Sequence, residues 1–432
     1  MKKIILLIIF IYPFLPLVSQ SRTMEIGELI NRQEYFKLKR ELDKTDSVEV
    51  NAIVWNMANA FVNTYFNNPK EAIDNIRTLL NNYQNDIGVE NSASMLLLLL
   101  ENYSSQREYA VVATLSESLM NQFSSHKELY TIFEKYQQHF SRLSDVPKQR
   151  IDTAGTSVSF LRDSVGIIII PVIDHNGKEH NFILDTGAEY SAISESSMSD
   201  FNTNIVVDSV GVIGTSRAGG KLGVSDRLSI GDMSAENVLF LVLADSLLSP
   251  KYEGRVVYNI DGIIGWDFIR EFRNISIDNK RGIISFNTEN QYPIATGNLI
   301  VSSLTPFVEV ISETDTLNFI LDTGTSINAS ILTNRNLSKH QNQIVDMDAT
   351  PYRAGGIGGV ITNQKVYNLP DFSLKIGQTA LKHSIDIAVN DLIYQHNYSI
   401  PMDGIIGQDI ILLCDIFFID LSTMSVNMIT AN

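Results

Sequence analysis

Two copies of one seven-residue segment carry the side chains in this chain that are best suited to chemistry. The sequence NFILDTG occupies residues 181–187 and returns unchanged at residues 318–324. The apolar run in each copy predicts a buried strand, and the glycine after it predicts a tight turn. Each copy should therefore hold one carboxylate, Asp185 or Asp322, on a loop at the end of a hydrophobic strand.

A pair of neighbouring carboxyl groups suits hydrolysis by an activated water. Two carboxyl groups about 3 Å apart do not both ionise easily, so one pKa rises and the other falls. The ionised group can activate a water, while the protonated group polarises a carbonyl and later protonates the leaving amine. Because such a pair titrates as a unit, the sequence leaves open whether Asp185 or Asp322 is the base.

The repeat extends well beyond these two segments. DGIIG occurs at residues 261–265 and again at 403–407, and an Ile-Asp pair follows each copy, at 277–278 and 419–420. A fixed internal repeat of this length defines a fold. Two similar halves with one aspartate each predict a pseudo-twofold arrangement in which the two carboxylates meet at the axis.

These motifs resemble the aspartic proteases, in particular the retropepsin-like lobes that occur singly in retroviral enzymes and in tandem in pepsins. The matching residues are DTGA at 185–188, DTGTS at 322–326 and the two IIG segments. The resemblance implies a bilobal β-barrel protease fold, with lobes at residues 155–290 and 298–432. Two complete lobes in one chain favour a monomeric active site that takes a peptide or protein substrate.

The resemblance also implies which residues support the two carboxylates. The threonines of the DTG motifs would cross-link the two loops by hydrogen bonds, and the glycines of these motifs would let backbone amides face the carboxylates. The last glycine of each IIG segment would pack under a loop. These residues are Thr186, Gly187, Thr323, Gly324, Gly265 and Gly407.

The two lobes differ directly after the DTG motif. Thr325 follows the second motif, where a hydroxyl can hydrogen-bond the neighbouring carboxylate as in pepsins, whereas Ala188 follows the first and cannot. Because fewer donors raise the pKa of a carboxylate, we expect activity to extend to weakly acidic or near-neutral pH. Glu189, which comes next, could perturb the dyad or bind a basic side chain.

Glycine-rich stretches lie between each aspartate and its IIG segment. Glycines in a hairpin permit close backbone approach and large changes of φ and ψ, and the protease family uses such hairpins as flaps that close over the peptide. Surface turns without substrate contact are the alternative in both lobes. The candidate flap residues are Gly219, Gly220, Tyr352, Gly358 and Gly359.

Hairpins should deliver the chain into both motifs. Residues 174–177 (DHNG) separate two apolar runs, and Asn-Gly is a strong hairpin signal. In the second lobe a polar turn at 313–316 has the same place, while residues 152–157 are expected to form a linker. His175 and His180 flank the first hairpin without a cysteine or acidic cluster, so we interpret them as turn-edge residues and expect no metal and no cofactor.

The first twenty residues predict a secretory signal peptide. Lys2 and Lys3 precede an uncharged apolar run, and small and polar residues follow it. The run is short for a membrane span and holds two prolines, and no cysteine follows it for lipid attachment. Residues 1–20 therefore predict export from a bacterial cell, to the periplasm or beyond, with no membrane anchor after cleavage.

Residues 22–150 predict a separate helical domain. Apolar residues recur at helical spacing within residues 52–66, 71–83, 107–123 and 127–143. Paired helices of this length resemble a tetratricopeptide-type solenoid. A docking surface for a partner, a prosegment that covers the cleft, and a bundle that only supports the protease all remain open.

Composition excludes some classes of function. The net charge of −16 argues against nucleic acid and anionic membranes as partners. Cys414 is the only cysteine, so no internal disulfide can form, and its apolar neighbours predict core packing.

The sequence as a whole predicts a multidomain α plus all-β protein that acts as an exported aspartic endopeptidase. A catalytically inactive protease-like peptide-binding protein is the first alternative, and a scaffold with a helical docking domain is the second. Intact DTG motifs in both lobes favour the enzyme.

Overall fold

The computed structural model describes most of the chain, and each statement below concerns these residues. They are residues 17–152, 154–214, 217–249, 251–252, 255–256, 260–289, 297–313, 315–326, 329–344, 346–356, 359–392 and 398–430. The chain divides into two compact units, Met1–Val146 and Pro147–Asn432. Most of the expected signal peptide, residues 1–16, lies outside the described residues. In the described part, no helix combines the length and apolar character needed to span a membrane.

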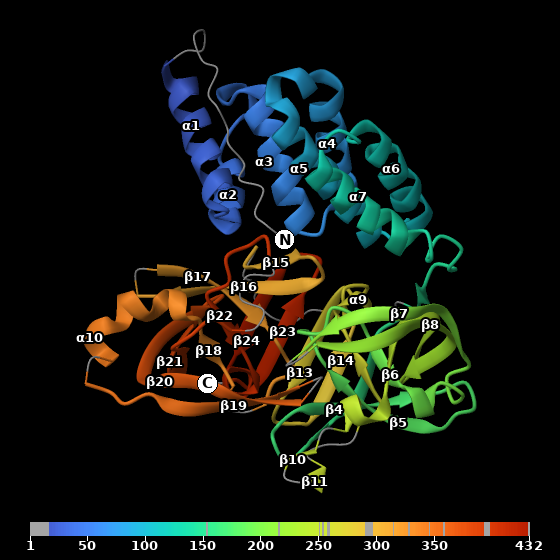
Figure 1. The fold of residues 1–432 in the computed structure, drawn as a ribbon. Helices are drawn as coiled ribbons and strands as arrows, with labels where there is room; N and C mark the ends of the chain where they lie inside the picture. Colours follow the sequence, from blue (N-terminus) through green and yellow to red (C-terminus); the bar gives the residue numbers. More distant parts are fainter. Residues whose placement is uncertain are drawn as a thin grey trace. The chain divides into compact units, whose positions relative to one another are not determined.

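The first unit is helical, as its periodicity predicts (Figure 1). Asn67 adopts a left-handed φ of 58° after α3, and Pro69 opens α4, so a helix break separates the two helical stretches predicted at 52–66 and 71–83. Helices that are neighbours in the chain pack on each other, α3 on α4 and α6 on α7. The helices are α1 (Leu17–Arg32), α2 (Tyr35–Leu42), α3 (Ala52–Tyr65), α4 (Pro69–Asn82), α5 (Gln84–Ser105), α6 (Tyr109–Gln122) and α7 (Lys127–Phe140), with a 3-10 turn at Ser47–Glu49.

The first lobe of the second unit is a closed barrel. The strand order β9-β6-β12-β5-β4-β8 returns to β9, because β8 also pairs with β9. The predicted hairpin at 174–177 is confirmed, since β4 and β5 pair antiparallel around it. The strands are β1 (Arg150–Ile151), β2 (Thr156–Ser159), β3 (Leu161–Arg162), β4 (Ile168–Ile173), β5 (Glu179–Leu184), β6 (Ala192–Ser194), β7 (Thr203–Ile213), β8 (Arg217–Ile230), β9 (Met233–Leu243), β10 (Lys251–Tyr252), β11 (Arg255–Val256) and β12 (Gly262–Ile264), and the short helices are α8 (Asp245–Leu248) and α9 (Trp266–Ile269).

The second lobe repeats this topology. Its order β16-β17-β22-β18-β21-β20 closes through a pairing of β16 with β20. The turn predicted at 313–316 joins β16 to β17, which pair antiparallel. The elements are β15 (Leu299–Ser302), β16 (Thr305–Ser312), β17 (Asp315–Leu321), β18 (Ile331–Leu332), β19 (Thr350–Gly356), β20 (Gly359–Ile376), β21 (Thr379–Ala388) and β22 (Gly404–Ile406), with a 3-10 segment at Asn334–His340 and short helices α10 (Gln341–Ile344) and α11 (Gln408–Ile411).

A separate five-stranded sheet joins the lobes, in the order β2-β14-β13-β23-β24. The repeated Ile-Asp pairs lie in β13 (Asn274–Asp278) and β23 (Ile416–Asp420), which pair antiparallel with Ile275 opposite Ile419. The outer strands are β14 (Ile283–Phe286) and β24 (Ser425–Ile429). One strand of each repeat therefore meets its counterpart at the middle of this sheet.

The linker expected at 152–157 is wrong in its bounds. β1 precedes it and pairs with β9, and β2 begins at Thr156, which lies opposite Phe286. The sequence did not reveal these strands because they are only two and four residues long and their partners lie far along the chain.

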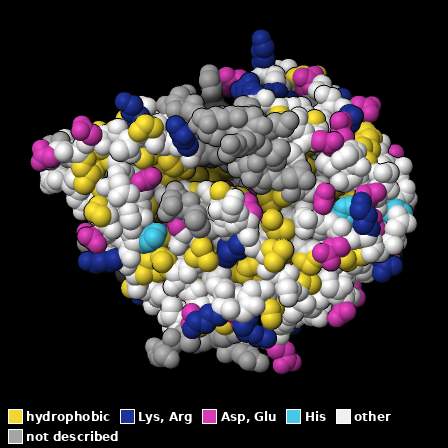
Figure 2. Space-filling model, turned by 90° about the horizontal axis from the view of Figure 1, so that it is seen from below, with side chains coloured by type: hydrophobic (Ala, Val, Ile, Leu, Met, Phe, Trp, Pro, Cys, Tyr) yellow, Lys and Arg dark blue, Asp and Glu magenta, His cyan; other side chains and the backbone are white. Residues whose placement is uncertain are grey.

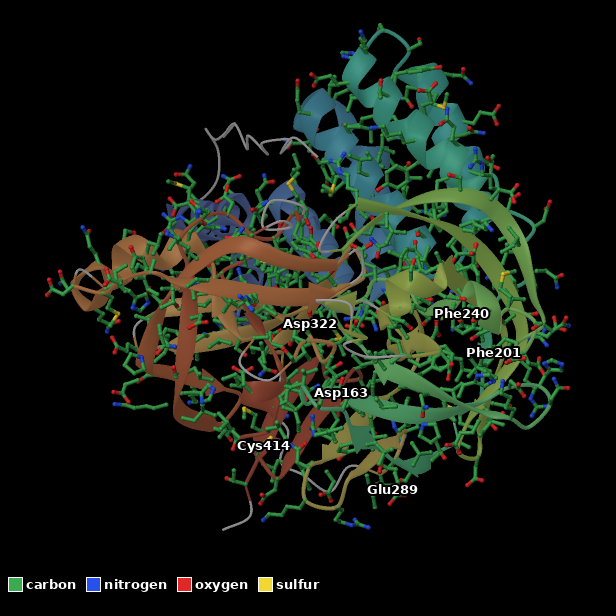
Figure 3. All side chains as sticks on the ribbon, turned by 60° about the horizontal axis from the view of Figure 1, so that its bottom comes forward. Asp163, Phe201, Phe240, Glu289, Asp322 and Cys414 are labelled. Carbon is green, nitrogen blue, oxygen red and sulfur yellow. The ribbon has the colours of Figure 1, made fainter. Side chains whose placement is uncertain are left out.

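Apolar side chains fill the lobes without disulfide support. Phe201 and Phe240 lie inside the first barrel with ring centroids 6.2 Å apart (Figure 3). Cys414 is buried, and burial raises the pKa of its thiol to about 12, so it packs as an unreactive core residue as predicted. Acidic, basic and hydrophobic side chains intermingle on the face shown in Figure 2.

Candidate active site

Equivalent strands place the two DTG loops. β5 ends at Leu184 and β17 at Leu321, and each runs parallel to the IIG strand of its own lobe. The backbone N–H of Asp185 donates to Ile264 O at 3.0 Å, and that of Asp322 donates to Ile406 O at 3.0 Å. The repeated IIG segments therefore set the position of each aspartate through the sheet.

The last glycines of these segments lie directly against the loops. A Cβ on Gly265 would come within 2.5 Å of the Tyr190 backbone carbon, and a Cβ on Gly407 within 2.3 Å of Thr325 Oγ1. Real Cβ atoms do not approach so closely, so only glycine fits at either position.

Thr186 and Thr323 cross-link the loops in a reciprocal manner. Thr186 Oγ1 donates to Leu321 O at 2.7 Å and accepts from the Thr323 N–H at 3.0 Å. Thr323 Oγ1 donates to Leu184 O at 2.7 Å and accepts from the Thr186 N–H at 3.0 Å. Both threonines are fully buried, so these four bonds form out of water, where an unmade bond is costly.

The glycines of the DTG motifs let each loop approach the opposite carboxylate. A Cβ on Gly187 would lie 2.4 Å from Asp322 Cγ, and a Cβ on Gly324 would lie 2.3 Å from Asp185 Cγ. Their N–H groups donate to Oδ1 of their own aspartates, each at 2.9 Å. Glycine is therefore required for the close approach of the two loops.

The carboxyl groups of Asp185 and Asp322 are neighbours, because each lies against the glycine of the opposite DTG loop and the charge of Asp185 acts on Asp322. Asp322 lies where the two lobes meet (Figure 3). Burial raises both pKa values, and the neighbouring charge of Asp185 adds to the rise at Asp322, whose pKa lies well above its ordinary value. N–H groups of Ala188 and Gly187 offset part of the rise at Asp185. Both carboxyl groups therefore hold a proton more readily than an ordinary aspartate, and they titrate as a pair.

The expected role of the Thr325 hydroxyl is wrong. It donates to the backbone oxygen of Asp322 at 3.0 Å rather than to a carboxylate, because Gly407 packs against the same hydroxyl. Glu189 is exposed, and its backbone oxygen accepts from the Asp267 N–H.

A serine–aspartate pair behind each loop escaped the sequence analysis. Ser191 Oγ donates to Asp267 Oδ1 at 2.8 Å and accepts from the Gly265 N–H at 3.0 Å. In the second lobe, Ser330 Oγ donates to Asp409 Oδ1 at 2.6 Å and accepts from the Gly407 N–H at 2.8 Å. All four side chains are buried. The available signal was an aspartate two residues after each IIG glycine.

The second loop has a further support. The buried Gln408 donates from Nε2 to Thr323 O at 2.5 Å and accepts from Arg162 Nη1 at 2.7 Å. Arg162 also donates to Asn279 Oδ1 at 2.7 Å. Trp266 has the corresponding place in the first lobe, so this polar chain supports one loop only.

The glycine-rich stretches form the predicted hairpins. Gly219 and Gly220 lie in β8, which pairs with β7, while Tyr352 lies in β19 and Gly359 begins β20. Gly358 lies outside the described residues. A Cβ on Gly219 would meet nothing within 4 Å. The flap role of these residues stays a prediction.

The interpretation of His180 as a turn-edge residue is wrong, because its side chain is 2% exposed. Its ring nitrogens lie 3.1 Å from Asp174 Oδ2, 3.7 Å from Asp200 Oδ2 and 3.8 Å from Asp261 Oδ2. Two of these carboxylates come from segments far from the hairpin in sequence, which is why no acidic cluster was visible. His175 is exposed, as expected.

Comparisons with known proteins found similarity to aspartyl proteases in the first lobe. Residues 172–268 match the family model described as aspartyl protease. A retropepsin-like aspartic protease from Rickettsia conorii is similar at 15% identity and a TM-score of 0.22, covering 32% of this chain and 94% of its own. Basic 7S globulin from soybean is similar at 11% identity and a TM-score of 0.40, covering 65% and 96%. No curated protein matches the sequence. The segment that carries Asp185 and Gly265 is thus similar to aspartyl proteases.

Proposed function

We propose that this chain is an exported aspartic endopeptidase that uses Asp185 and Asp322 as its catalytic pair. The observation that carries the proposal is that each carboxyl group lies directly against the DTG loop of the other repeat, which makes the two acids neighbours. Equivalent strands, glycines and threonines of two repeats hold the groups in place. A packing role alone would not need two acids in contact, because burying them together is unfavourable.

The reaction needs one ionised and one protonated carboxyl group in the pair. The ionised carboxylate takes a proton from a water, whose oxygen attacks the scissile carbonyl carbon, while the protonated carboxyl group donates a hydrogen bond to the carbonyl oxygen. A tetrahedral intermediate results. Its C–N bond then breaks as the amine leaves with a proton from the pair, and the carboxylic acid product forms. Since the acids share one proton, their titration belongs to the pair.

Single amide variants test the assignment. Asp185→Asn and Asp322→Asn should each abolish cleavage of a peptide library followed by mass spectrometry, because each removes one of the two acids. The control is Asp232→Asn, which alters an exposed carboxylate elsewhere in the second unit. Circular dichroism checks that all variants fold. Undiminished cleavage by both dyad variants would show that the pair is not catalytic.

The pH dependence of the rate tests the direction of both pKa shifts. Activity requires one ionised and one protonated acid, so the rate rises as the pair loses its first proton and falls as it loses its second. Because burial raises both pKa values, the active range should reach weakly acidic and near-neutral pH. A profile of kcat/KM confined to strongly acidic pH would contradict this expectation.

Export is the part of the proposal that depends on the N-terminus. Cleavage near residues 19–22 would leave a mature chain that keeps Arg22, whose guanidinium binds Glu41 at 2.9 Å and Thr45. N-terminal sequencing of protein from the periplasm or medium of the expressing bacterium should find a start in this range. A cytoplasmic protein with an intact N-terminus would refute export and leave the proposed chemistry untouched.

A further inference from the structure

His180 lies near the start of β5, whereas Asp185 follows the other end of this strand. Carboxylates cluster around the His180 ring. The side chain is 2% exposed, and its ring packs on Phe201 with centroids 4.8 Å apart. A buried polar ring needs partners, because burying one without them costs free energy. Here three carboxylates surround the ring, and one of them, that of Asp174, hydrogen-bonds to it.

Two of the carboxylates face the same ring nitrogen. His180 Nε2 lies 3.1 Å from Asp174 Oδ2 and 3.7 Å from Asp200 Oδ2, and the three atoms lie within 4.8 Å of one another. Donors bound to Zn²⁺ at about 2.1 Å in tetrahedral geometry stand about 3.4 Å apart. The two observed separations bracket this value, so small side-chain shifts would bring all three atoms to one ion.

Asp174 is oriented before any ion binds. Its Oδ1 accepts from the N–H groups of Asn176 at 2.7 Å and Lys178 at 3.0 Å. The turn that closes the β4–β5 hairpin thus fixes this carboxylate and directs its Oδ2 to His180.

Asp261 lies where a carboxylate can hold the imidazole without itself binding the ion. Its Oδ2 accepts from the Asn181 N–H at 2.9 Å and lies 3.8 Å from the second ring nitrogen of His180, Nδ1. Histidines that bind metals typically direct the other ring nitrogen to a carboxylate, which fixes the tautomer. Nε2 hydrogen-bonds to Asp174 Oδ2 at 3.1 Å, so a bound cation would take the place of a proton between these two atoms.

The second lobe provides an internal comparison. Asp403 Oδ2 accepts from the Asn318 N–H at 2.9 Å, as Asp261 does from Asn181, but the residue before Asn318 is the buried Leu317. The aspartate–asparagine contact therefore belongs to the fold. The imidazole is an addition to the first lobe that the fold itself does not require.

Lys178 shows that the cluster attracts a cation. Its Nζ lies 2.6 Å from Asp200 Oδ2, while 62% of its side chain is exposed. An exposed lysine can leave this contact at little cost, because surface ion pairs contribute at most about 1 kcal/mol. The ammonium would compete with a bound ion for the same oxygen.

We propose that Asp174 Oδ2, His180 Nε2 and Asp200 Oδ2 bind a divalent transition-metal ion of the Zn²⁺ class, with Asp261 orienting the imidazole. An imidazole ligand favours such ions over Ca²⁺ and Mg²⁺, which prefer oxygen. The ion would join the β4–β5 hairpin to the residues that lead into β7, the first strand of the candidate flap hairpin. The site is distinct from the dyad and does not depend on the proposed protease activity.

The test is equilibrium binding of Zn²⁺ to the full chain after removal of metal with a chelator, by isothermal titration calorimetry and by metal analysis of the dialysed protein. The wild type should bind one equivalent and gain thermal stability. His180→Gln should lose this binding at least tenfold, and Asp261→Asn about tenfold, as loss of an outer partner typically does. Ca²⁺ should bind far more weakly than Zn²⁺.

Two further variants keep the test decisive. Lys178→Met should bind Zn²⁺ more tightly than the wild type, since it removes the competing ammonium and leaves the buried residues intact. His126→Gln is the control, because this imidazole is exposed in the helical unit and is not part of the cluster, so its loss should leave binding unchanged. Equal binding by wild type and His180→Gln would mean an adventitious ion only. That result, no binding by the wild type, or no gain with Lys178→Met, would overturn the proposal.

Discussion

Thr186→Val is the perturbation that most directly tests how the two lobes hold the dyad. Valine keeps the shape of threonine and removes the hydroxyl. The change eliminates two buried hydrogen bonds, to Leu321 O at 2.7 Å and from the Thr323 N–H at 3.0 Å. Both groups then remain buried without these partners.

The expected magnitude follows from these two bonds. A net loss of about 1 kcal/mol per hydrogen bond gives a lower estimate of about 2 kcal/mol, and stranding two buried polar groups at about 3 kcal/mol each gives an upper estimate of about 6 kcal/mol. Thr186→Ser keeps the hydroxyl and loses only a methyl group, which should cost about 1 kcal/mol. The difference between the two variants isolates the cross-link.

Tryptophan fluorescence provides an assay specific to this unit. The chain has two tryptophans, Trp55 in the helical unit and the fully buried Trp266. The backbone N–H of Trp266 donates to Ala188 O at 2.7 Å. In a Trp55→Phe background, urea unfolding followed by fluorescence reports on Trp266 and the first catalytic loop. The same proteins are assayed for kcat on a cleaved peptide.

The valine variant should unfold at markedly lower urea concentration than the serine variant and lose at least tenfold in kcat, because the loops no longer fix the distance between the acids. Equal stability and equal kcat for the two variants would refute the reasoning, since the hydroxyl would then contribute nothing to the junction of the lobes.

Three further predictions concern the same site. Asp322→Asn should be more stable than wild type at neutral pH and equally stable below pH 3.8, because the raised folded-state pKa of Asp322 stabilises the fold at low pH and this contribution is lost as pH rises. The loss amounts to at most about 1.4 kcal/mol per pH unit. Chemical denaturation at several pH values measures it, and a difference in stability that stays constant with pH would contradict the prediction. Gly187→Ala should reduce kcat by more than about 100-fold, since its methyl carbon would lie 2.4 Å from Asp322 Cγ. Gly211→Ala, whose methyl group meets nothing within 4 Å, should have a kcat near that of the wild type. Similar kinetics for both variants would exclude steric control of the dyad. Gln408→Leu should lower kcat about tenfold with little change in KM, because it removes the donor to Thr323 O at 2.5 Å, and an unchanged kcat would show that the second loop holds itself.

Local patterns were sufficient for most of the strands and hairpins. The Asn176-Gly177 turn, the apolar runs that end at Asp185 and Asp322, and the helix break at Asn67 all agree with the structure. Each depends on the conformational preferences of a few consecutive residues, which is why sequence alone revealed them.

Side-chain partners across long sequence separations were not visible in the same way. Ser191 and Asp267 meet only after β6 and β12 pair, and Gln408 meets Arg162 across the two lobes. The interpretation of His180 failed for this reason, since Asp200 and Asp261 reach it only in the folded barrel.

The sequence by itself determined the twofold repeat, the pair of acids and the turn residues that carry them, because identical segments impose the same local backbone twice. The tertiary structure alone decided that the acids are neighbours, that burial raises both of their pKa values, and that the Thr325 hydroxyl binds a backbone oxygen. Burial and the charge of a neighbour set these properties, and both depend on which distant segments pack together.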